Sequence, residues 1–133
     1  MPTATEMGRV QLLIMQVLWR LGRATAREIT EALNESNSGQ ESTIAHSTVQ
    51  TLLRQLEDKG SVSHEAKGRT FTFFAVVNEN EFKESAAANL LHRVFQGSVT
   101  DLVSQLLSVS EVSEEEQRAL RKLINKNSRK GKR

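Results

Sequence analysis

The sequence STVQTLLRQLEDKG at residues 47–60 is followed almost at once by VSHEAKGRTFTFFAVV at residues 62–77. Apolar residues of the first stretch recur at the spacing of one helix face, and they are Val49, Leu52, Leu53 and Leu56. Gly60 suits the positive φ that commonly ends a helix. The second stretch alternates like paired strands around residues 67–69, which predicts a β-hairpin with a basic tip. A helix that leads directly into such a hairpin predicts a winged helix-turn-helix, whose helix enters the major groove of DNA.

The helix face opposite this apolar stripe carries mainly uncharged hydrogen-bonding groups. Its members are Ser47, Gln50, Thr51, Arg54 and Asp58. An ordinary solvated helix explains this face about as well as a DNA-binding helix does, and the basic hairpin that follows favours DNA. Side chains near the helix start can reach base edges, and an Arg further along can reach a phosphate. The residues predicted to bind DNA are Ser47, Thr48, Gln50, Thr51 and Arg54 of the helix and Lys67 and Arg69 of the hairpin tip.

The composition of the chain fits a protein of the cytoplasm. It has 133 residues, of which 38% are hydrophobic and 26% charged, and the absence of cysteine excludes disulfides and thiolate metal sites. No apolar run approaches the roughly 20 residues of a membrane span, and the start lacks the pattern of a signal peptide. We therefore expect a cytoplasmic protein with no membrane insertion. The formal net charge is only +2, so the argument for DNA rests on where the cations lie.

The residues before the central stretch predict two helices. Residues 6–21 are apolar on two sides, which is typical of a central core helix; the two sides are Val10, Leu13, Ile14, Val17 and Leu21, and Leu12, Met15 and Trp19. A capping box, Thr25 with Glu28, then begins a short helix that runs to about Leu33. Residues 34–43 are polar and predict a loop, and the helix of the central stretch is expected to start near Ala45 or His46.

The residues after the hairpin predict three further helices. One begins at a cap on Asn78 or Asn80 and runs to about Gln96, one follows a cap on Ser98, and one covers residues 114–127 after a capping box at residues 113–116. Each has an apolar side that must dock on the first domain or on a second copy of the chain. We expect a homodimer, because a twofold protein matches a palindromic DNA site. The predicted dimerisation residues are Leu90, Leu91, Val94, Phe95, Leu102, Val103, Leu106, Leu120, Leu123 and Ile124.

The predicted fold is mainly α with a small β-hairpin. It comprises a winged helix-turn-helix N-terminal domain at residues 1–77, a helical C-terminal dimerisation domain at residues 78–127, and a basic, disordered tail at residues 128–133. A fragment that ends at Val77 or Asn78 is therefore expected to be monomeric and largely folded, and to bind its operator at least about tenfold more weakly.

No pattern in the chain predicts an enzyme. The three histidines, His46, His64 and His92, lie in different predicted elements without the spacing of metal ligands. The seven glycines form no phosphate-binding loop, and neighbouring carboxylates lie on predicted helix surfaces or caps. We therefore expect no catalytic residue, cofactor, metal or small-molecule substrate.

Taken in order, several segments resemble the penicillinase and methicillin-resistance repressor family of bacterial winged-helix regulators. The matching segments are Ile14-Met15, Leu18-Trp19, residues 25–29, residues 47–60, Gly68-Arg69, Phe95, Gly97-Ser98, Leu102-Val103 and residues 113–124. The resemblance implies a homodimeric transcriptional repressor of an antibiotic-response (β-lactam) circuit. It also implies induction through a membrane sensor and a protease that cleaves the C-terminal domain. Better-known members have an Asn-Phe bond at the cleavage point, where this chain has Gln105-Leu106.

Two functions from different classes follow from these observations. The first is a repressor that binds a palindromic operator as a homodimer. The second is a winged-helix protein–protein interaction module without DNA binding, which is favoured by residues 1–77, where eight basic residues balance eight acidic ones. DNA affinity falls steeply with salt and an apolar protein interface responds little, so a salt series separates the two functions.

Overall fold

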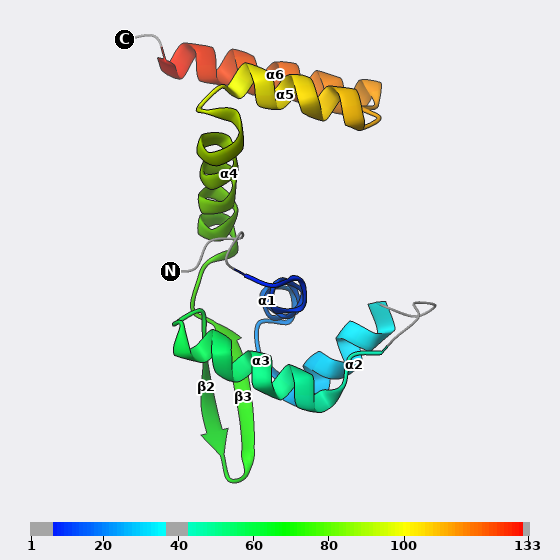
Figure 1. Cartoon of the computed structure of the whole chain (residues 1–133), viewed down its shortest axis with the longest axis vertical. Helices are drawn as coiled ribbons and strands as arrows, with labels where there is room; N and C mark the ends of the chain where they lie inside the picture. The colour runs from blue at the N-terminus through cyan, green and yellow to red at the C-terminus, as the bar shows by residue number, and fades with distance from the viewer. Residues whose placement is uncertain (1–6, 37–42, 132–133) are drawn as a thin grey trace. The chain divides into compact units, whose positions relative to one another are not determined.

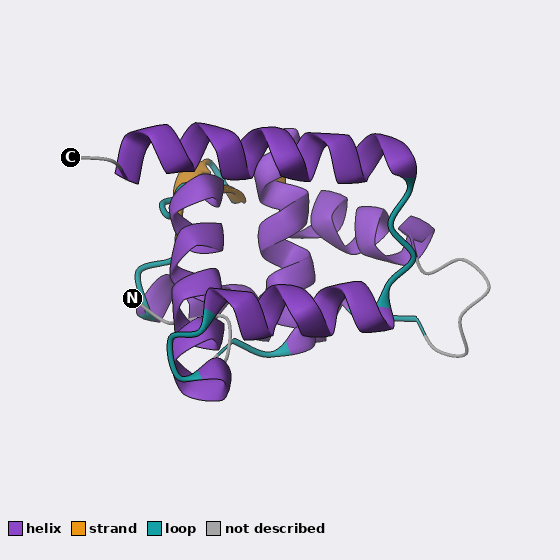
Figure 2. Cartoon of the chain, turned by 90° about the horizontal axis from the view of Figure 1, so that it is seen from above, coloured by secondary structure: helices purple, strands orange, loops and turns teal. Residues whose placement is uncertain are grey.

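The computed structural model describes residues 7–36 and 43–131 of the chain (Figure 1). The chain divides into two compact units, Met1–Leu90 and Leu91–Arg133. Helix dominates the described residues, and the strands belong to one small sheet (Figure 2). None of the described helices has the length and apolar character needed to cross a membrane.

The first unit has the architecture of a winged helix-turn-helix, which confirms the predicted fold class. Its elements are α1 (Arg9–Leu21), β1 (Ala24–Thr25), α2 (Ala26–Ser36), α3 (His46–Asp58), β2 (Val62–Lys67), β3 (Thr70–Ala75) and most of α4 (Glu79–Phe95). The three strands form an antiparallel sheet in the order β1-β3-β2. We call the hairpin of β2 and β3 the wing.

The core of this unit lies where the three N-terminal helices meet the sheet. Each helix contributes fully or nearly fully buried side chains: Ile14, Met15 and Leu18 from α1, Ile29 and Leu33 from α2, and Val49, Leu53 and Leu56 from α3. Burying one such side chain contributes about 1.5–3 kcal/mol. The apolar stripe predicted for α3 is therefore confirmed as the face that fixes this helix on the core.

The start and the apolar pattern of α1 differ from the prediction. The helix begins at Arg9, not at residue 6, which lies outside the described residues, because the Gln11 side chain accepts the Gly8 N–H at 3.0 Å and caps the helix there. Leu21, predicted in an apolar stripe, is 49% exposed, whereas Leu18, outside both predicted stripes, is 1% exposed. Gln11 is itself buried, and its amide donates to Oε1 of Gln55 on α3 at 3.0 Å.

Helix α2 starts as predicted and ends later. Thr25 and Glu28 form the capping box, with the Thr25 N–H bonded to Oε1 of Glu28 at 2.8 Å and the Glu28 N–H bonded to Oγ1 of Thr25 at 3.1 Å. The helix continues past Leu33 to Ser36, so residues 34–36, expected in a loop, are helical. The rest of that predicted loop, residues 37–42, lies outside the described residues.

Helix α3 starts at His46, as predicted, and its approach is fixed by Asn34. The Asn34 side chain accepts the Ile44 N–H at 2.8 Å and donates to the Ile44 carbonyl at 3.0 Å. Gly60, with a φ of +83°, follows the helix end and turns the chain toward the wing. The polar residue in α2 therefore sets where the chain enters α3.

The wing is the predicted hairpin, and a third strand joins it. Gly68 turns the tip with a φ of +61°, and His64 of β2 pairs with Phe73 of β3. Strand β1 pairs with β3 through Ala24 and Phe73. The sequence did not predict β1, because two residues are too short to show alternation.

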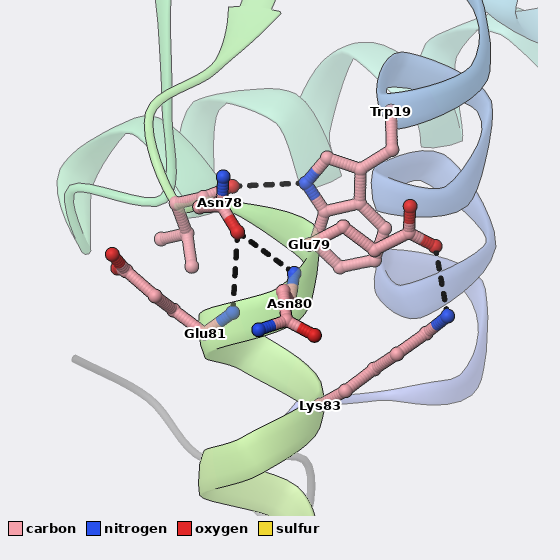
Figure 3. Close-up of polar contacts among 7 residues, drawn as sticks. Trp19, Asn78, Glu79, Asn80, Glu81 and Lys83 are labelled. Atoms are coloured by element: carbon pink, nitrogen blue, oxygen red, sulfur yellow. Dashed lines mark hydrogen bonds and ion pairs between the residues drawn. The ribbon is translucent and has the colours of Figure 1, made fainter.

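The start of α4 is packed on α1 (Figure 3). Nε1 of Trp19 donates to the Val77 carbonyl at 2.9 Å, and the Trp19 ring lies 5.3 Å from that of Phe82, which is 8% exposed. Asn78 caps α4, as one of two predicted residues, by accepting the N–H groups of Asn80 and Glu81 at 2.8 and 3.2 Å. The apolar core thus continues past Val77 into α4.

The second unit contains the end of α4 with α5 (Val99–Val109) and α6 (Glu114–Gly131). The predicted caps are present: Ser98 Oγ accepts the Asp101 N–H and Ser113 Oγ accepts the Glu116 N–H, each at 3.1 Å. Helix α6 continues to Gly131, so the predicted disordered tail is wrong for residues 128–131, and residues 132–133 lie outside the described part. Arg and Lys are good helix formers, and positive charge is favourable near a helix C-terminus, which explains the extension.

Candidate nucleic-acid interface

The polar face of α3 is open to solvent. The five side chains of α3 that are predicted to bind DNA are all exposed, namely Ser47, Thr48, Gln50, Thr51 and Arg54. The Thr51 hydroxyl donates to the Ser47 carbonyl at 3.0 Å, so Thr51 offers a ligand an acceptor oxygen and a methyl group. The buried stripe on the opposite side of the helix orients this face, because both follow the same helical repeat.

A cavity of about 630 Å³ lies between α3, the wing and the start of α2. Three of the predicted residues line it: Gln50 and Arg54 of α3 and Arg69 of the wing tip. The other four predicted residues do not line this cavity: Ser47, Thr48, Thr51 and Lys67. The fold thus brings one predicted base-contacting residue together with two predicted phosphate-contacting residues.

The cavity is also lined by residues that were not predicted to bind DNA, and Arg27 and His46 are among them. Arg27 is exposed in the first turn of α2 and adds a third arginine to the cavity wall. Its place at the start of α2 could have indicated a role in DNA binding, because the first helix of a helix-turn-helix crosses the DNA backbone. A wall with three arginines suits a polyanion better than an apolar protein surface.

Two side chains on the cavity wall join α3 to the wing. Nδ1 of His64 lies 2.8 Å from each carboxylate oxygen of Glu57, and the His64 ring stacks on Phe71 at 4.2 Å with 20° between the planes. On the wing's other face, Arg23 pairs with Glu65 at 3.2 Å and lies 4.8 Å from the Phe74 ring centroid. Side chains outside the wing therefore hold both of its faces.

The side chains predicted for dimerisation, which except for Leu90 belong to the second unit, are exposed or half-buried in the single chain. None of residues 91–127 is buried within the single chain. Seven of the predicted residues have 37–64% of their surface exposed: Leu90, Val94, Val103, Leu106, Leu120, Leu123 and Ile124. The other three, Leu91, Phe95 and Leu102, are half-buried. Gln105 and Leu106, the predicted cleavage region, are exposed and lie within α5.

Across the described parts of the chain, no group of three or more His, Asp or Glu residues could hold a metal ion.

Comparison with known proteins identifies one family. The family model described as "Penicillinase repressor" matches residues 7–126. The penicillinase repressor of Bacillus licheniformis is 24% identical over 127 residues, which cover 96% of this chain and 95% of that protein. The methicillin resistance regulatory protein MecI of Staphylococcus aureus (strain N315) is 23% identical over 121 residues, with 91% and 94% covered. Among solved structures, the complex structure of hsRosR-SG is similar in fold, with a TM-score of 0.55, 17% identity and 96% of each chain covered.

Proposed function

Because the chain belongs to the penicillinase repressor family, we propose that it is a transcriptional repressor that binds a palindromic DNA operator as a homodimer. One observation carries this proposal: the exposed polar face of α3 shares a cavity with the basic tip of the wing. In this arrangement Gln50 contacts a base edge in the major groove, and Arg54 and Arg69 contact phosphates on either side.

We assign the seven predicted residues and Arg27 to this interface. Ser47, Thr48, Gln50 and Thr51 face the bases, and Arg54, Lys67, Arg69 and Arg27 face the backbone. This division follows from side-chain chemistry, because a glutamine amide matches adenine bidentately whereas arginine and lysine neutralise phosphates. The protein–protein interaction alternative has no comparable support, since the cavity wall carries three arginines and one carboxylate.

The homodimer forms through the second unit in this proposal. Exposed leucine, valine and isoleucine side chains on three helices lose contact with water when two copies associate, and each gains about 1.5–3 kcal/mol when fully buried. A twofold axis then places two α3 helices on half-sites one or more helical turns apart. The N-terminal part of the chain binds DNA, and the end of α4 together with α5 and α6 forms the dimer interface.

The proposed circuit is an antibiotic-response one of the β-lactam type. The resemblance implies a membrane sensor whose signal leads to cleavage near Gln105 and Leu106. Cleavage within α5 would remove α6 from the dimer and lower the affinity of the repressor for DNA.

Selection of genomic fragments with purified full-length protein, followed by sequencing of the bound DNA, tests the proposed function. We expect a palindromic site whose affinity falls steeply as salt rises, because binding releases counterions from the phosphates. Recovery of no preferred site, together with a salt-insensitive protein partner, would favour the interaction module instead.

Replacing Gln50 with alanine should remove base discrimination. We expect Gln50→Ala to weaken binding to the selected operator by about 1–3 kcal/mol and to leave binding to random DNA nearly unchanged. Gel-shift titrations on the two duplexes measure this difference. Gln16→Ala is the matched control, because Gln16 is also exposed but lies on α1. Equal losses on both duplexes would show that Gln50 only positions the protein.

Removing Arg69 should weaken binding to all DNA sequences alike. The guanidinium at the wing tip is proposed to neutralise one phosphate, so Arg69→Ala should lower the slope of log affinity against log salt by about one unit. Titrations at several salt concentrations on operator and random duplexes measure the slope. The control is Arg20→Ala, an exposed arginine in the last turn of α1. An unchanged slope for the Arg69 variant would contradict a wing–phosphate contact.

A further inference from the structure

We infer that Glu57 and His64 act as positioning residues for DNA binding, by holding the wing at the angle at which Arg69 reaches the backbone. We call this pair the clasp, and its role rests on the proposed function. His64 Nδ1 lies 2.8 Å from both oxygens of the Glu57 carboxylate. Glu57 is in the last turn of α3 and His64 is in β2, so the clasp bridges the turn that connects α3 to the wing.

The clasp lies partway between the fixed base of the wing and its tip. The base is fixed by Ser61, whose N–H donates to the Leu56 carbonyl and whose carbonyl accepts the Val76 N–H, both at 2.9 Å. Beyond His64 the hairpin runs on to its turn at Gly68. A restraint at His64 therefore limits how far the tip can swing relative to α3.

Aromatic stacking extends the restraint to the second strand of the wing. The His64 ring stacks on Phe71 at 4.2 Å and lies 5.5 Å from Phe73, both on β3. Phe71 is 47% exposed, although it is a large apolar side chain. Glu57 thus holds both strands of the wing: β2 by the contact with His64 and β3 through the His64 ring.

A negative charge at Glu57 is unexpected on a surface proposed to bind DNA. Its carboxylate lines the same cavity as Arg27, Arg54 and Arg69, where a negative charge repels DNA phosphates. The side chains of His64 and Glu57 are 28% and 33% exposed, so the contact is partly buried and also contributes to folding stability, which the test must separate from placement of the wing. Placement of the wing accounts for the acid at this position.

The test compares removal of Glu57 with removal of its neighbour Asp58 in the full-length protein. On the palindromic duplex recovered by selection, we expect Glu57→Ala to bind about three- to tenfold more weakly, because the wing is released. Asp58→Ala removes the same charge from an exposed residue that does not line the cavity, so its affinity should stay equal or rise. If only the charge mattered, both variants would bind DNA more tightly. If the clasp positions the wing, Glu57→Ala binds more weakly and Asp58→Ala does not.

Two more variants separate the clasp contact from other properties of these residues. Glu57→Gln keeps an acceptor for His64 and removes the negative charge, so its affinity should equal or exceed that of the native chain. His64→Phe keeps a ring that can stack on Phe71 but cannot bond to Glu57, so it should lose about as much affinity as Glu57→Ala. Circular dichroism checks that every variant is folded, and either Glu57→Ala or His64→Phe suffices if the other does not fold.

A double-mutant cycle with Arg69 distinguishes positioning from general stabilisation. If the clasp acts through Arg69, the effect of Glu57→Ala should nearly vanish when Arg69 is already alanine. The same cycle with Gln50, which lies on α3 itself, should be additive. Additive losses in both cycles, or tighter binding by Glu57→Ala, would overturn the inference while the repressor function stands. Failure of the native protein to bind any duplex would instead contradict the proposed function.

Discussion

A fragment that ends at Leu90 is expected to be a folded monomer whose affinity for the operator is at least about tenfold lower than that of the full-length protein. The fragment keeps the whole first unit, including Phe82, and lacks the second unit with its exposed apolar helices. A dimer holds its second α3 close to the second half-site, which raises affinity without a new base contact, and the monomer loses this advantage. Sedimentation measures the assembly state, and a gel shift on the palindromic duplex measures the affinity.

Substitutions in the full-length chain provide the matched comparison. Ile124 is 64% exposed on α6, so Ile124→Asp should separate the dimer and weaken DNA binding without truncation. Lys122→Ala, at an exposed position on the same helix, should do neither. Native protein that sediments as a monomer at micromolar concentration while it holds a palindromic site would contradict the proposed mechanism.

Replacing Phe82 with alanine should lower the free energy of unfolding of the first unit by about 3–5 kcal/mol, as expected for a large aromatic side chain removed from a core. Phe82 is 8% exposed and packs against Trp19 with ring centroids 5.3 Å apart. Trp19 is the only tryptophan of the chain, so its fluorescence during urea unfolding reports on this contact directly.

The control for this prediction is Ser85→Ala, an exposed position one turn further along α4, which should change the unfolding free energy by less than about 0.5 kcal/mol. If Phe82→Ala lowered the unfolding free energy as little as Ser85→Ala, the first domain would end near Val77, as the sequence predicts. A large loss would place the first turns of α4 inside the DNA-binding domain, so that a fragment ending at Val77 lacks part of its core.

Elements with a long and regular pattern were predictable from the sequence, and those fixed by distant contacts were not. The buried and exposed faces of α3 follow from an uninterrupted helical repeat, and the wing follows from alternation around Gly68. Phe82 was absent from the predicted core because its partner, Trp19, lies far away in the chain. The burial of Gln11 likewise depends on Gln55, a partner that no local pattern identifies.

The candidate interface could likewise be predicted only where its residues share one local pattern. Gln50 and Arg54 were selected because they share one face of a single helix, and Arg69 because it lies at a hairpin tip. Arg27 enters the same cavity only through the packing of α2 against α3, which the sequence does not display. The contact between Glu57 and His64 depends on how sharply the chain turns after Gly60, and residue spacing alone does not give that angle.

The paired hydrogen bonds between Asn34 and Ile44 have a consequence for how this protein family can change over time. They join Asn34, in the last turn of α2, to Ile44, just before α3, and so hold the start of α3 against α2. Doubling the length of a loop whose ends are held costs only about 0.6 kcal/mol in closure entropy. Insertions and deletions in this segment should therefore accumulate among relatives without disturbing operator recognition, as long as the asparagine is kept.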